Sequence, residues 1–152
     1  MKNSMLLTVC ASVATFATVA IGEVAPSEVM YTETGAVEGS LTGVAGDAAN
    51  GAMVFQNRKK GNCLACHANS DMLDQLFHGE IGPSLDGAGS RWSEAELRGL
   101  LTNAKNTFDG TMMPAFYVDS GYTRVLPKFE GKSNLSAQEV EDVLAYIQTL
   151  TE

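Results

Sequence analysis

Residues 61–70 read GNCLACHANS, so that Cys63 and Cys66 stand three positions apart and His67 follows directly behind the second cysteine. Three kinds of site use a Cys-x-x-Cys pair: a structural metal centre, a redox-active pair of thiols, and a covalent attachment point for a cofactor. Each of these sites needs different residues elsewhere in the chain. The rest of the sequence therefore has to distinguish between them.

Two of the three alternatives lack the residues that they need. A structural zinc ion takes four ligands. Cys10 lies inside the N-terminal apolar run, so the usable cysteines and histidines are Cys63, Cys66, His67 and His78, and His67 has little freedom to join its neighbours around one small ion. A thiol–disulfide oxidoreductase places its cysteine pair at the start of a helix that follows a strand. Here the pair follows a predicted helix, and the sequence has no β-α-β pattern.

Covalent haem attachment suits the motif better. Two thioether bonds to a haem need cysteines about one helical turn apart, and the next histidine then lies where an axial iron ligand is required. The spacing of Cys63, Cys66 and His67 meets this requirement. Because the motif is short, its interpretation depends on further features at the places where haem chemistry needs them.

A sixth iron ligand is available downstream in the stretch GTMMPAFY, which contains Met112 and Met113. A thioether ligand raises the reduction potential of a haem. Pro114 restricts the backbone of the preceding residue, so Met113 is favoured over Met112. His78 is the competing ligand, but it follows His67 closely and is interpreted as a loop histidine.

Two further features concern the surroundings of the predicted haem. An axial histidine needs an acceptor for its other ring nitrogen, and the carbonyl of Pro83, in IGPSL, is placed to supply one. Arg91 and Trp92 carry donors that suit the haem propionates. Arg91 and Trp92 could equally well be a surface arginine and a core tryptophan that contact no haem.

The N-terminus has the features of an export signal. An apolar run covers residues 5–21, after Lys2 and before a site of small residues. This pattern predicts a secretory signal peptide over residues 1–22 and a periplasmic mature protein. A retained membrane anchor is the alternative, because the run is almost long enough to span a bilayer, but Thr and Ser interrupt it.

The mature chain is acidic. The sequence has 10 Lys and Arg against 18 Asp and Glu, and loss of Lys2 with the signal peptide leaves nine against 18, a net charge of −9. Such a charge disfavours nucleic acid and anionic membranes as partners. Loss of the signal peptide also leaves Cys63 and Cys66 as the only cysteines of the mature chain, which are too few for a disulfide scaffold.

Helical patterns dominate the rest of the chain, which predicts an all-α fold. Asp47 is a candidate cap for a helix that ends in the basic run at residue 60. Ser93 with Glu96, and Ser136 with Glu139, have the spacing of a capping box, and each pair is followed by an apolar stripe at helical spacing. Gly51, Phe55 and Tyr146 are expected where the first and last of these helices meet. A weaker helical pattern covers residues 71–77.

Two segments lack helical periodicity. Residues 23–46 are rich in Gly, Ser, Thr and Glu, and are interpreted as an extended arm ahead of a domain over residues 47–152. The second segment, residues 117–135, is a long irregular loop. Exposed segments of this kind become ordered on a partner, so they favour a stably bound subunit over a free electron shuttle.

Together these features resemble the class I cytochromes c: a helix, CLACH, GPSL, a Met-Pro loop and a closing helix with an aromatic residue. The match runs from about Asp47 to Leu150 and implies one covalent haem c with a few short helices around it. A narrower resemblance, carried by GNCLACH, GPSLDGAGSRW, LRGLLTNAKNTFDGTMMPAFY and EDVLAYIQTLT, is to SoxX, the mono-haem subunit of the SoxAX cytochromes.

The SoxX resemblance implies a role in periplasmic sulfur oxidation. It implies a heterodimer with a SoxA-like cytochrome subunit, which joins thiosulfate oxidatively to a cysteine of a carrier protein, an L-cysteine S-thiosulfotransferase reaction. The substrate chemistry would lie on the partner, and this chain would pass electrons to a soluble cytochrome c. The resemblance assigns haem attachment to Cys63 and Cys66, iron ligation to His67 and Met113, and orientation of His67 to Pro83. The alternative function is a diffusible class I cytochrome c.

Overall fold

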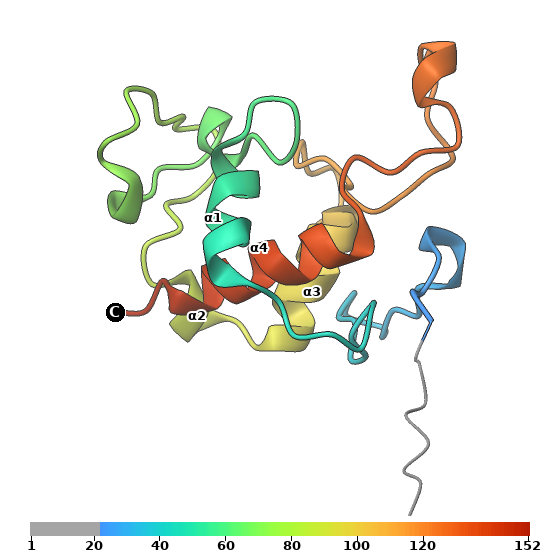
Figure 1. The fold of residues 1–152 in the computed structure, drawn as a ribbon, viewed down its shortest axis with the longest axis horizontal. Helices are drawn as coiled ribbons and strands as arrows, with labels where there is room; N and C mark the ends of the chain where they lie inside the picture. Colours follow the sequence, from blue (N-terminus) through green and yellow to red (C-terminus); the bar gives the residue numbers. More distant parts are fainter. Residues whose placement is uncertain (1–21) are drawn as a thin grey trace, which may run out of the picture.

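A computed structural model describes residues 22–152, so the predicted signal peptide lies outside the described residues except for Gly22. The described part contains no β-strand, which confirms the all-α prediction. Four α-helices form the body of the molecule (Figure 1). They are α1 (Ala48–Gln56), α2 (Ala88–Arg91), α3 (Glu94–Asn103) and α4 (Ala137–Thr149), with single turns of 3-10 helix at Pro26–Glu28, Cys63–Ala65, Ser70–Met72, Ala104–Asn106 and Pro127–Phe129.

Helix α1 begins as predicted but ends early. The Asp47 side chain accepts hydrogen bonds from the backbone N–H groups of Ala49 and Asn50, at 2.8 and 3.3 Å, and so satisfies two of the unpaired donors of the first turn. The helix ends at Gln56. The basic run at residues 58–60 therefore lies in a turn after the helix and not in its last turn.

Helices α3 and α4 both begin with the predicted capping box. The Ser93 hydroxyl accepts from the Glu96 N–H and the Glu96 carboxylate accepts from the Ser93 N–H, and Ser136 and Glu139 repeat the arrangement. In this arrangement two backbone donors are paired at each helix start. The apolar stripe of α4 is buried as expected, whereas the weak pattern over residues 71–77 forms only the turn Ser70–Met72.

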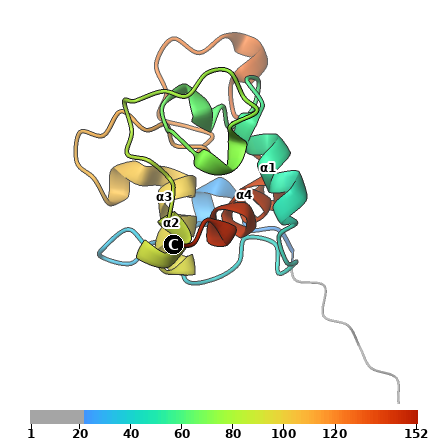
Figure 2. The ribbon, with the colours of Figure 1, turned by 90° about the vertical axis from the view of Figure 1, so that its left-hand side faces the viewer.

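Helix α4 is the centre of the packing, because it contacts α1, α2 and α3 (Figures 1 and 2). It crosses α1 at Gly51, where a Cβ atom would lie 1.9 Å from the carbonyl oxygen of Asp142. No side chain fits at this crossing. One turn further along, Phe55 and Tyr146 pack edge to face with ring centroids 5.3 Å apart, and the predicted contact between these helices is confirmed.

The arm at residues 23–46 does not have the exposure expected from its sequence. Its residues Ala36, Val37 and Leu41 are buried in the core of the chain itself. The arm passes so close to α3 that a Cβ atom on Gly99 would lie 2.1 Å from the carbonyl oxygen of Gly35. The arm therefore packs on its own domain, and it no longer argues for a partner.

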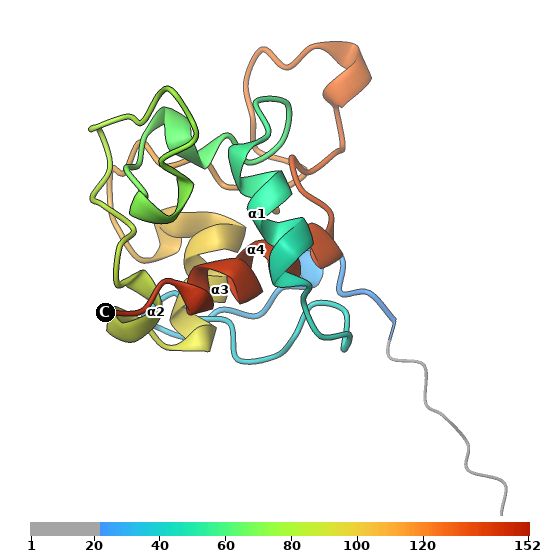
Figure 3. The ribbon, with the colours of Figure 1, turned by 60° about the vertical axis from the view of Figure 1, so that its left-hand side comes forward.

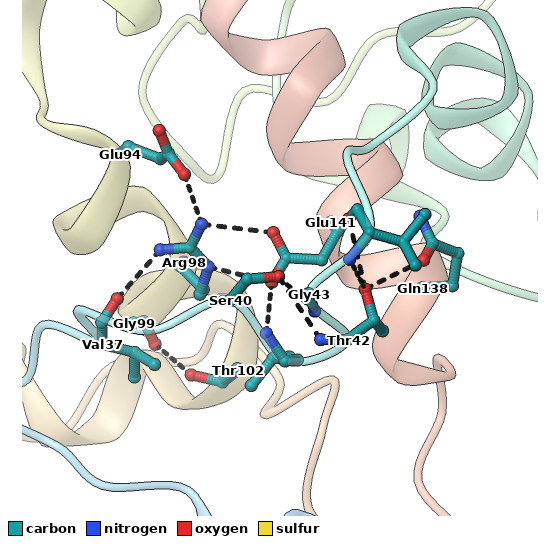
Figure 4. A network of polar contacts seen from close by, with 12 residues as sticks. Val37, Ser40, Thr42, Gly43, Glu94, Arg98, Gly99, Thr102, Gln138 and Glu141 are labelled. Carbon is teal, nitrogen blue, oxygen red and sulfur yellow. Dashed lines mark hydrogen bonds and ion pairs between the residues drawn. The ribbon is translucent and has the colours of Figure 1, made fainter. Parts of the chain in front are cut away.

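A buried ion pair holds the arm in place (Figure 4). Arg98 on α3 donates to Glu141 on α4 from Nε, at 2.9 Å, and to the Val37 carbonyl oxygen at 3.0 Å. Glu141 also accepts from the Leu41 N–H at 2.7 Å. Glu94 supplies a second carboxylate to the guanidinium. A buried charge is stable only when it is paired and hydrogen-bonded, and here the arm completes both requirements.

The other irregular segment projects from the body. In Figures 1 and 3, the chain after the α3 region leaves the helices, turns through Pro127–Phe129 and returns to the start of α4. The loop is closed at its base by a backbone hydrogen bond of 2.9 Å from the Leu135 N–H to the Phe116 carbonyl oxygen. Within the described residues, no helix has the length and apolar character that would span a membrane.

Candidate haem-attachment site

The Cys-x-x-Cys-His motif lies on one tight turn directly after α1. Residues Cys63–Ala65 form a turn of 3-10 helix, and the Cys63 carbonyl oxygen accepts from the N–H groups of Cys66 and His67 at 3.1 and 3.0 Å. Both cysteines are partly buried, and no disulfide joins them. The turn thus presents two thiols and an imidazole from a single backbone unit.

The imidazole of His67 is held by the predicted proline. Its Nδ1 donates to the carbonyl oxygen of Pro83, with a nitrogen–oxygen distance of 2.7 Å. Because that carbonyl can only accept, Nδ1 carries the proton and Nε2 keeps its lone pair. This is the tautomer that a metal-ligating histidine requires.

Gly82 is a further element of this site, and sequence reasoning did not single it out. A Cβ atom at Gly82 would lie 2.4 Å from Cε1 of His67. The imidazole therefore lies against bare backbone, and any larger residue would displace it. The Gly-Pro pair in IGPSL was the available signal, but it is equally typical of an ordinary turn.

The loop that carries Pro83 is fastened to the motif along its length. Gly79, Gly82 and Leu85 donate backbone hydrogen bonds of 2.8, 2.8 and 2.9 Å to the carbonyl oxygens of Leu64, Cys66 and Ala68, respectively. The loop also passes close to the motif at Gly79, where an added Cβ atom would lie 2.1 Å from the Ala65 carbonyl oxygen. These bonds fix the distance between the Pro83 carbonyl and His67.

Arg91 contacts the same loop. Its guanidinium donates to the carbonyl oxygens of Asp86 and Ser84, the latter at 3.1 Å, and lies 3.9 Å from the Glu152 carboxylate. Two of its nitrogens are thus engaged by the loop after Pro83. A contact with a haem propionate stays a prediction. Trp92 is partly buried and packs edge to face on Phe108, with ring centroids 6.1 Å apart.

His78 is engaged on both ring nitrogens. Nδ1 accepts from the Asn69 N–H at 3.2 Å, and Nε2 donates to the Met72 carbonyl oxygen at 3.0 Å. A ring with both nitrogens bonded to backbone has no lone pair to offer a metal. This geometry agrees with the interpretation of His78 as a loop histidine.

The two methionines differ in their surroundings. Met113 is partly buried and packs against the hydrophobic core, whereas the Met112 side chain is 80% exposed. Lys105 holds this segment, because its Nζ donates to the carbonyl oxygens of Thr111 and Met113 at 2.9 and 3.3 Å. The lysine was not identified from the sequence, where nothing distinguishes it from a solvated surface residue.

A second polar cluster, also missed in the sequence, stabilises the chain just after the motif. Asn69 is fully buried and donates from Nδ2 to the Tyr146 hydroxyl at 2.8 Å. That hydroxyl donates in turn to the Asp71 carboxylate at 2.9 Å. Burial, together with the negative charge of Asp71, raises the pKa of Tyr146. The cluster ties the segment after His67 to α4.

The geometry also bears on the two other kinds of site. Burial raises the pKa of the Cys63 thiol to about 12, so the residue lacks the thiolate character that a redox-active cysteine needs. Within residues 22–152, no group of three or more Cys, His, Asp or Glu side chains could hold a metal ion.

Comparisons with known proteins identify the family of this chain. The family model for cytochrome c matches residues 48–151. A chain from the crystal structure of SoxXA from P. pantotrophus is 48% identical, with a TM-score of 0.80, and the match covers 86% of this chain and 100% of that chain. The chain belongs to the cytochrome c family. Membership implies a covalently bound haem c, and it confirms the predicted fold.

This cytochrome has a second, more distant relative. The methylamine utilization protein MauG from Methylophilus methylotrophus is 29% identical over 133 residues. The alignment covers 75% of this chain but only 39% of MauG. The likeness to the SoxXA chain, which covers that chain completely, confirms the resemblance to SoxX.

The residues of this cytochrome fit a covalent haem. Two thiols lie on one turn, the hydrogen bond to Pro83 leaves Nε2 of the adjacent imidazole unprotonated, and the ring packs against Gly82, where a Cβ atom would collide with it. The Met113 side chain, which carries the thioether, is partly buried and packs against the hydrophobic core. The donor set of two thiols, one imidazole and one thioether is that of a His/Met cytochrome c.

Proposed function

We propose that this chain is a periplasmic c-type cytochrome with one haem that serves as the electron-transfer subunit of a SoxAX-type heterodimer. The observation that carries the proposal is the 48% identity to the SoxXA chain over the whole of that chain. The hydrogen bond of 2.7 Å between His67 and Pro83 supports the haem site in particular, because it leaves Nε2 of His67 as the nitrogen that can bind iron.

Five residues form the proposed haem site. Cys63 and Cys66 would hold the haem through thioether bonds, and His67 and Met113 would ligate its iron. Pro83 orients His67 through the hydrogen bond to Nδ1. When bound, haem c supplies one-electron chemistry at its iron.

The remaining contacts set the properties of the site. Pro83 holds the proton on Nδ1, so the lone pair of the neutral imidazole lies on Nε2, where an iron would be bound. Met113 supplies a soft sulfur that favours the ferrous state and raises the reduction potential. Lys105 holds the loop on which that sulfur lies. With His67 and Met113 both engaged by the iron, the site would exchange electrons and would not bind substrate. Arg91 holds the loop after Pro83 by the carbonyl oxygens of Ser84 and Asp86, and it would be available to a haem propionate.

The reaction of the complex releases two electrons, so it requires an acceptor that can take them one after the other. Joining thiosulfate to a carrier cysteine forms one S–S bond, with release of the thiol proton and two electrons: R–SH and S₂O₃²⁻ give R–S–SSO₃⁻, H⁺ and two electrons. We assign the bond-forming step to the SoxA-like partner. This chain takes the electrons one at a time and passes them to a soluble cytochrome c.

The proposal includes the domain organisation. Residues 1–22 act as a signal peptide that directs the chain to the periplasm. Residues 23–46 form the arm, and residues 47–152 form the cytochrome c domain. The Thr and Ser residues that interrupt the apolar run, and the small residues that follow it, support cleavage over retention of an anchor.

The deciding experiment is a reconstitution. The chain is co-expressed with its SoxA-like partner in a periplasm that attaches haem c, the complex is purified, and the reduced carrier protein and thiosulfate are added. We expect the two cytochromes to co-purify and the haem absorbance of this chain to change to the reduced form. A chain that elutes as a monomer and is not reduced under these conditions would be a free electron shuttle instead.

A further inference from the structure

The segment that carries the two methionines leaves the end of α3 as a largely exposed loop, residues 107–114 (Figure 2). Beyond its first residues, few backbone contacts restrain it. The Thr111 N–H donates to the Phe108 carbonyl oxygen at 3.3 Å, within the loop itself, and Pro114 has no N–H to donate. Gly110 has a φ of 70° and open space around it, so it permits the reversal of the chain without holding it. The shape of this loop therefore needs a restraint from outside.

Lys105 supplies that restraint. It lies in the 3-10 turn at the end of α3, and its Nζ donates to the carbonyl oxygens of Thr111 and Met113, at 2.9 and 3.3 Å. The Asn103 side chain accepts from the Lys105 N–H at 3.2 Å, which fixes the backbone from which the lysine projects. Among residues 22–152, no other side chain from outside the loop hydrogen-bonds to residues 109–113.

The direction of these bonds distinguishes Lys105 from an ordinary helix-capping lysine. A lysine near the C-terminus of a helix commonly bonds to the last carbonyl oxygens of that same helix. Lys105 instead bonds to carbonyl oxygens six and eight positions ahead of it in the chain. Hydrogen bonds from an ammonium group are charge-assisted, and such bonds are among the stronger ones in proteins. The lysine therefore holds the loop and not the end of the helix.

The two bonds lie on either side of Met112. The carbonyls of Thr111 and Met113 both face Lys105, and the Met113 N–H donates to the Thr111 hydroxyl at 3.2 Å, so the peptide units around Met112 have little freedom to rotate. In this conformation the Met112 side chain is 80% exposed, whereas Met113 is partly buried against the core. Rotation of these peptide units is the motion that would bring Met112 inward and Met113 outward.

From these contacts we infer that Lys105 is a positioning residue that keeps Met113, and not the adjacent Met112, directed at the proposed haem site. The inference rests on the proposed function, because it takes Met113 as the iron ligand from there. Lys105 acts through the main chain on both sides of Met112 and not through either thioether. Without the lysine, either thioether would face the haem part of the time, and neither would be held firmly on the iron.

The test measures the affinity of the reduced, haem-loaded chain for carbon monoxide, which binds where an axial position of the iron is free. Lys105→Leu removes the donor without adding a thioether, and it should raise that affinity roughly 10-fold, because the form with a free axial position becomes more populated. The sulfur-to-iron charge-transfer band of the oxidised chain should weaken in parallel. Lys59→Leu is the matched control, since Lys59 is also exposed, and its affinity and band should equal those of the native chain.

A second pair of variants tests the choice between the two methionines. Met112→Ala alone should leave the carbon monoxide affinity unchanged, because Lys105 keeps Met112 directed outward. In the Lys105→Leu background, Met112→Ala should raise the affinity by a further factor of roughly 2, because one of two competing thioethers is lost. An effect of Met112 that appears only when Lys105 is absent is the non-additivity expected of residues that act through one shared element.

The outcomes separate this inference from the proposed function. If Lys105→Leu keeps the native affinity, or if Met112→Ala has the same effect with and without Lys105, the role of Lys105 is wrong and the proposed function stands. If the native chain lacks the charge-transfer band and binds carbon monoxide as tightly as Met113→Ala, the proposed ligation by Met113 fails, and the role of Lys105 fails with it. Urea unfolding completes the test, because a lysine that only stabilises the fold would change the stability and leave the affinity as it is.

Discussion

At the scale of single residues, the candidate site depends on a few atoms that are held by backbone. The Pro83 carbonyl fixes the tautomer of His67, and Gly82 makes room for the ring. Lys105 holds the Met113 segment by two carbonyl oxygens. The proposed ligands are therefore presented by loops whose shape is set locally, before any helix packing is considered.

Met113→Ala should open an axial position and lower the reduction potential, because the soft sulfur that favours ferrous iron is lost. The adjacent Met112→Ala is the matched control, since the Met112 side chain is 80% exposed. Potentiometric titration and binding of carbon monoxide measure both effects. An unchanged potential in the Met113 variant, or a change in the Met112 variant, would contradict the ligand assignment.

Gly82→Ala should displace His67, because the added Cβ would lie 2.4 Å from Cε1 of the ring. We expect an altered visible spectrum and a lower yield of haem-loaded protein. Gly39→Ala is the control, since a Cβ at Gly39 meets nothing within 4 Å. Native-like spectra and yield in the Gly82 variant would show that the imidazole does not depend on this contact.

At the scale of elements, α4 joins the parts of the molecule. It crosses α1 at Gly51. Its acidic side chains accept hydrogen bonds from backbone N–H groups of the arm and of the start of α1. The Asp142 carboxylate takes hydrogen bonds from the Asp47 N–H at 2.8 Å, from Asn50 at 2.6 Å and from Gln138 at 2.9 Å. One side chain thereby orders the start of α1 against α4.

Asp142→Asn should lower the free energy of unfolding at neutral pH by about 1–3 kcal/mol, because three donors lose a charged acceptor. Burial alone would raise the pKa of Asp142, but these hydrogen bonds outweigh it and lower the pKa. The stabilisation is thus present above the unfolded pKa of about 3.9 and is lost as the pH falls through the lower folded value.

Urea unfolding as a function of pH measures this effect. The difference between the native chain and Asp142→Asn should be constant near neutral pH and shrink as the pH falls below about 4. Glu33→Gln, at an exposed position of the arm, is the control and should stay within about 0.5 kcal/mol of native. A difference that grows towards acid pH would contradict the assigned direction.

The local features of the fold were predictable from the sequence, and most long-range ones were not. The capping boxes at Ser93 and Ser136 lie within four residues, so the sequence alone shows them. The pairing of Phe55 with Tyr146 is the long-range exception, because Gly51 marks a close helix crossing beside two aromatic residues. The burial of Leu41 depends on Glu141, 100 positions away. Nothing in the local pattern of the arm indicates that partner.

At the scale of the whole molecule, the arm and the helices form one core. Arg98 and Glu141 are 2% and 5% exposed and bind the arm by its backbone at Val37 and Leu41 (Figure 4). Tyr117 adds a third point, since its hydroxyl donates to the Val24 carbonyl oxygen at 2.7 Å. The domain therefore extends almost to the predicted cleavage site of the signal peptide.

Arg98→Ala should destabilise the chain by about 3–5 kcal/mol, because it leaves the Glu141 carboxylate buried without its partner. The arm should then become sensitive to protease before the helices unfold. Limited proteolysis with mass spectrometry and urea unfolding measure the two effects. Arg58→Ala, at an exposed position, should change stability by no more than about 0.5 kcal/mol. An arm that stays protected in the Arg98 variant would contradict its role as the anchor.

The contact between Leu41 and Glu141 also orders events during synthesis. The two residues are 100 positions apart, so the arm leaves the ribosome well before its binding place on α4 exists. Such non-local contacts form late. A chain interrupted before residue 141 would leave the arm without its anchor and open to proteolysis, so incomplete copies would be degraded and would not accumulate.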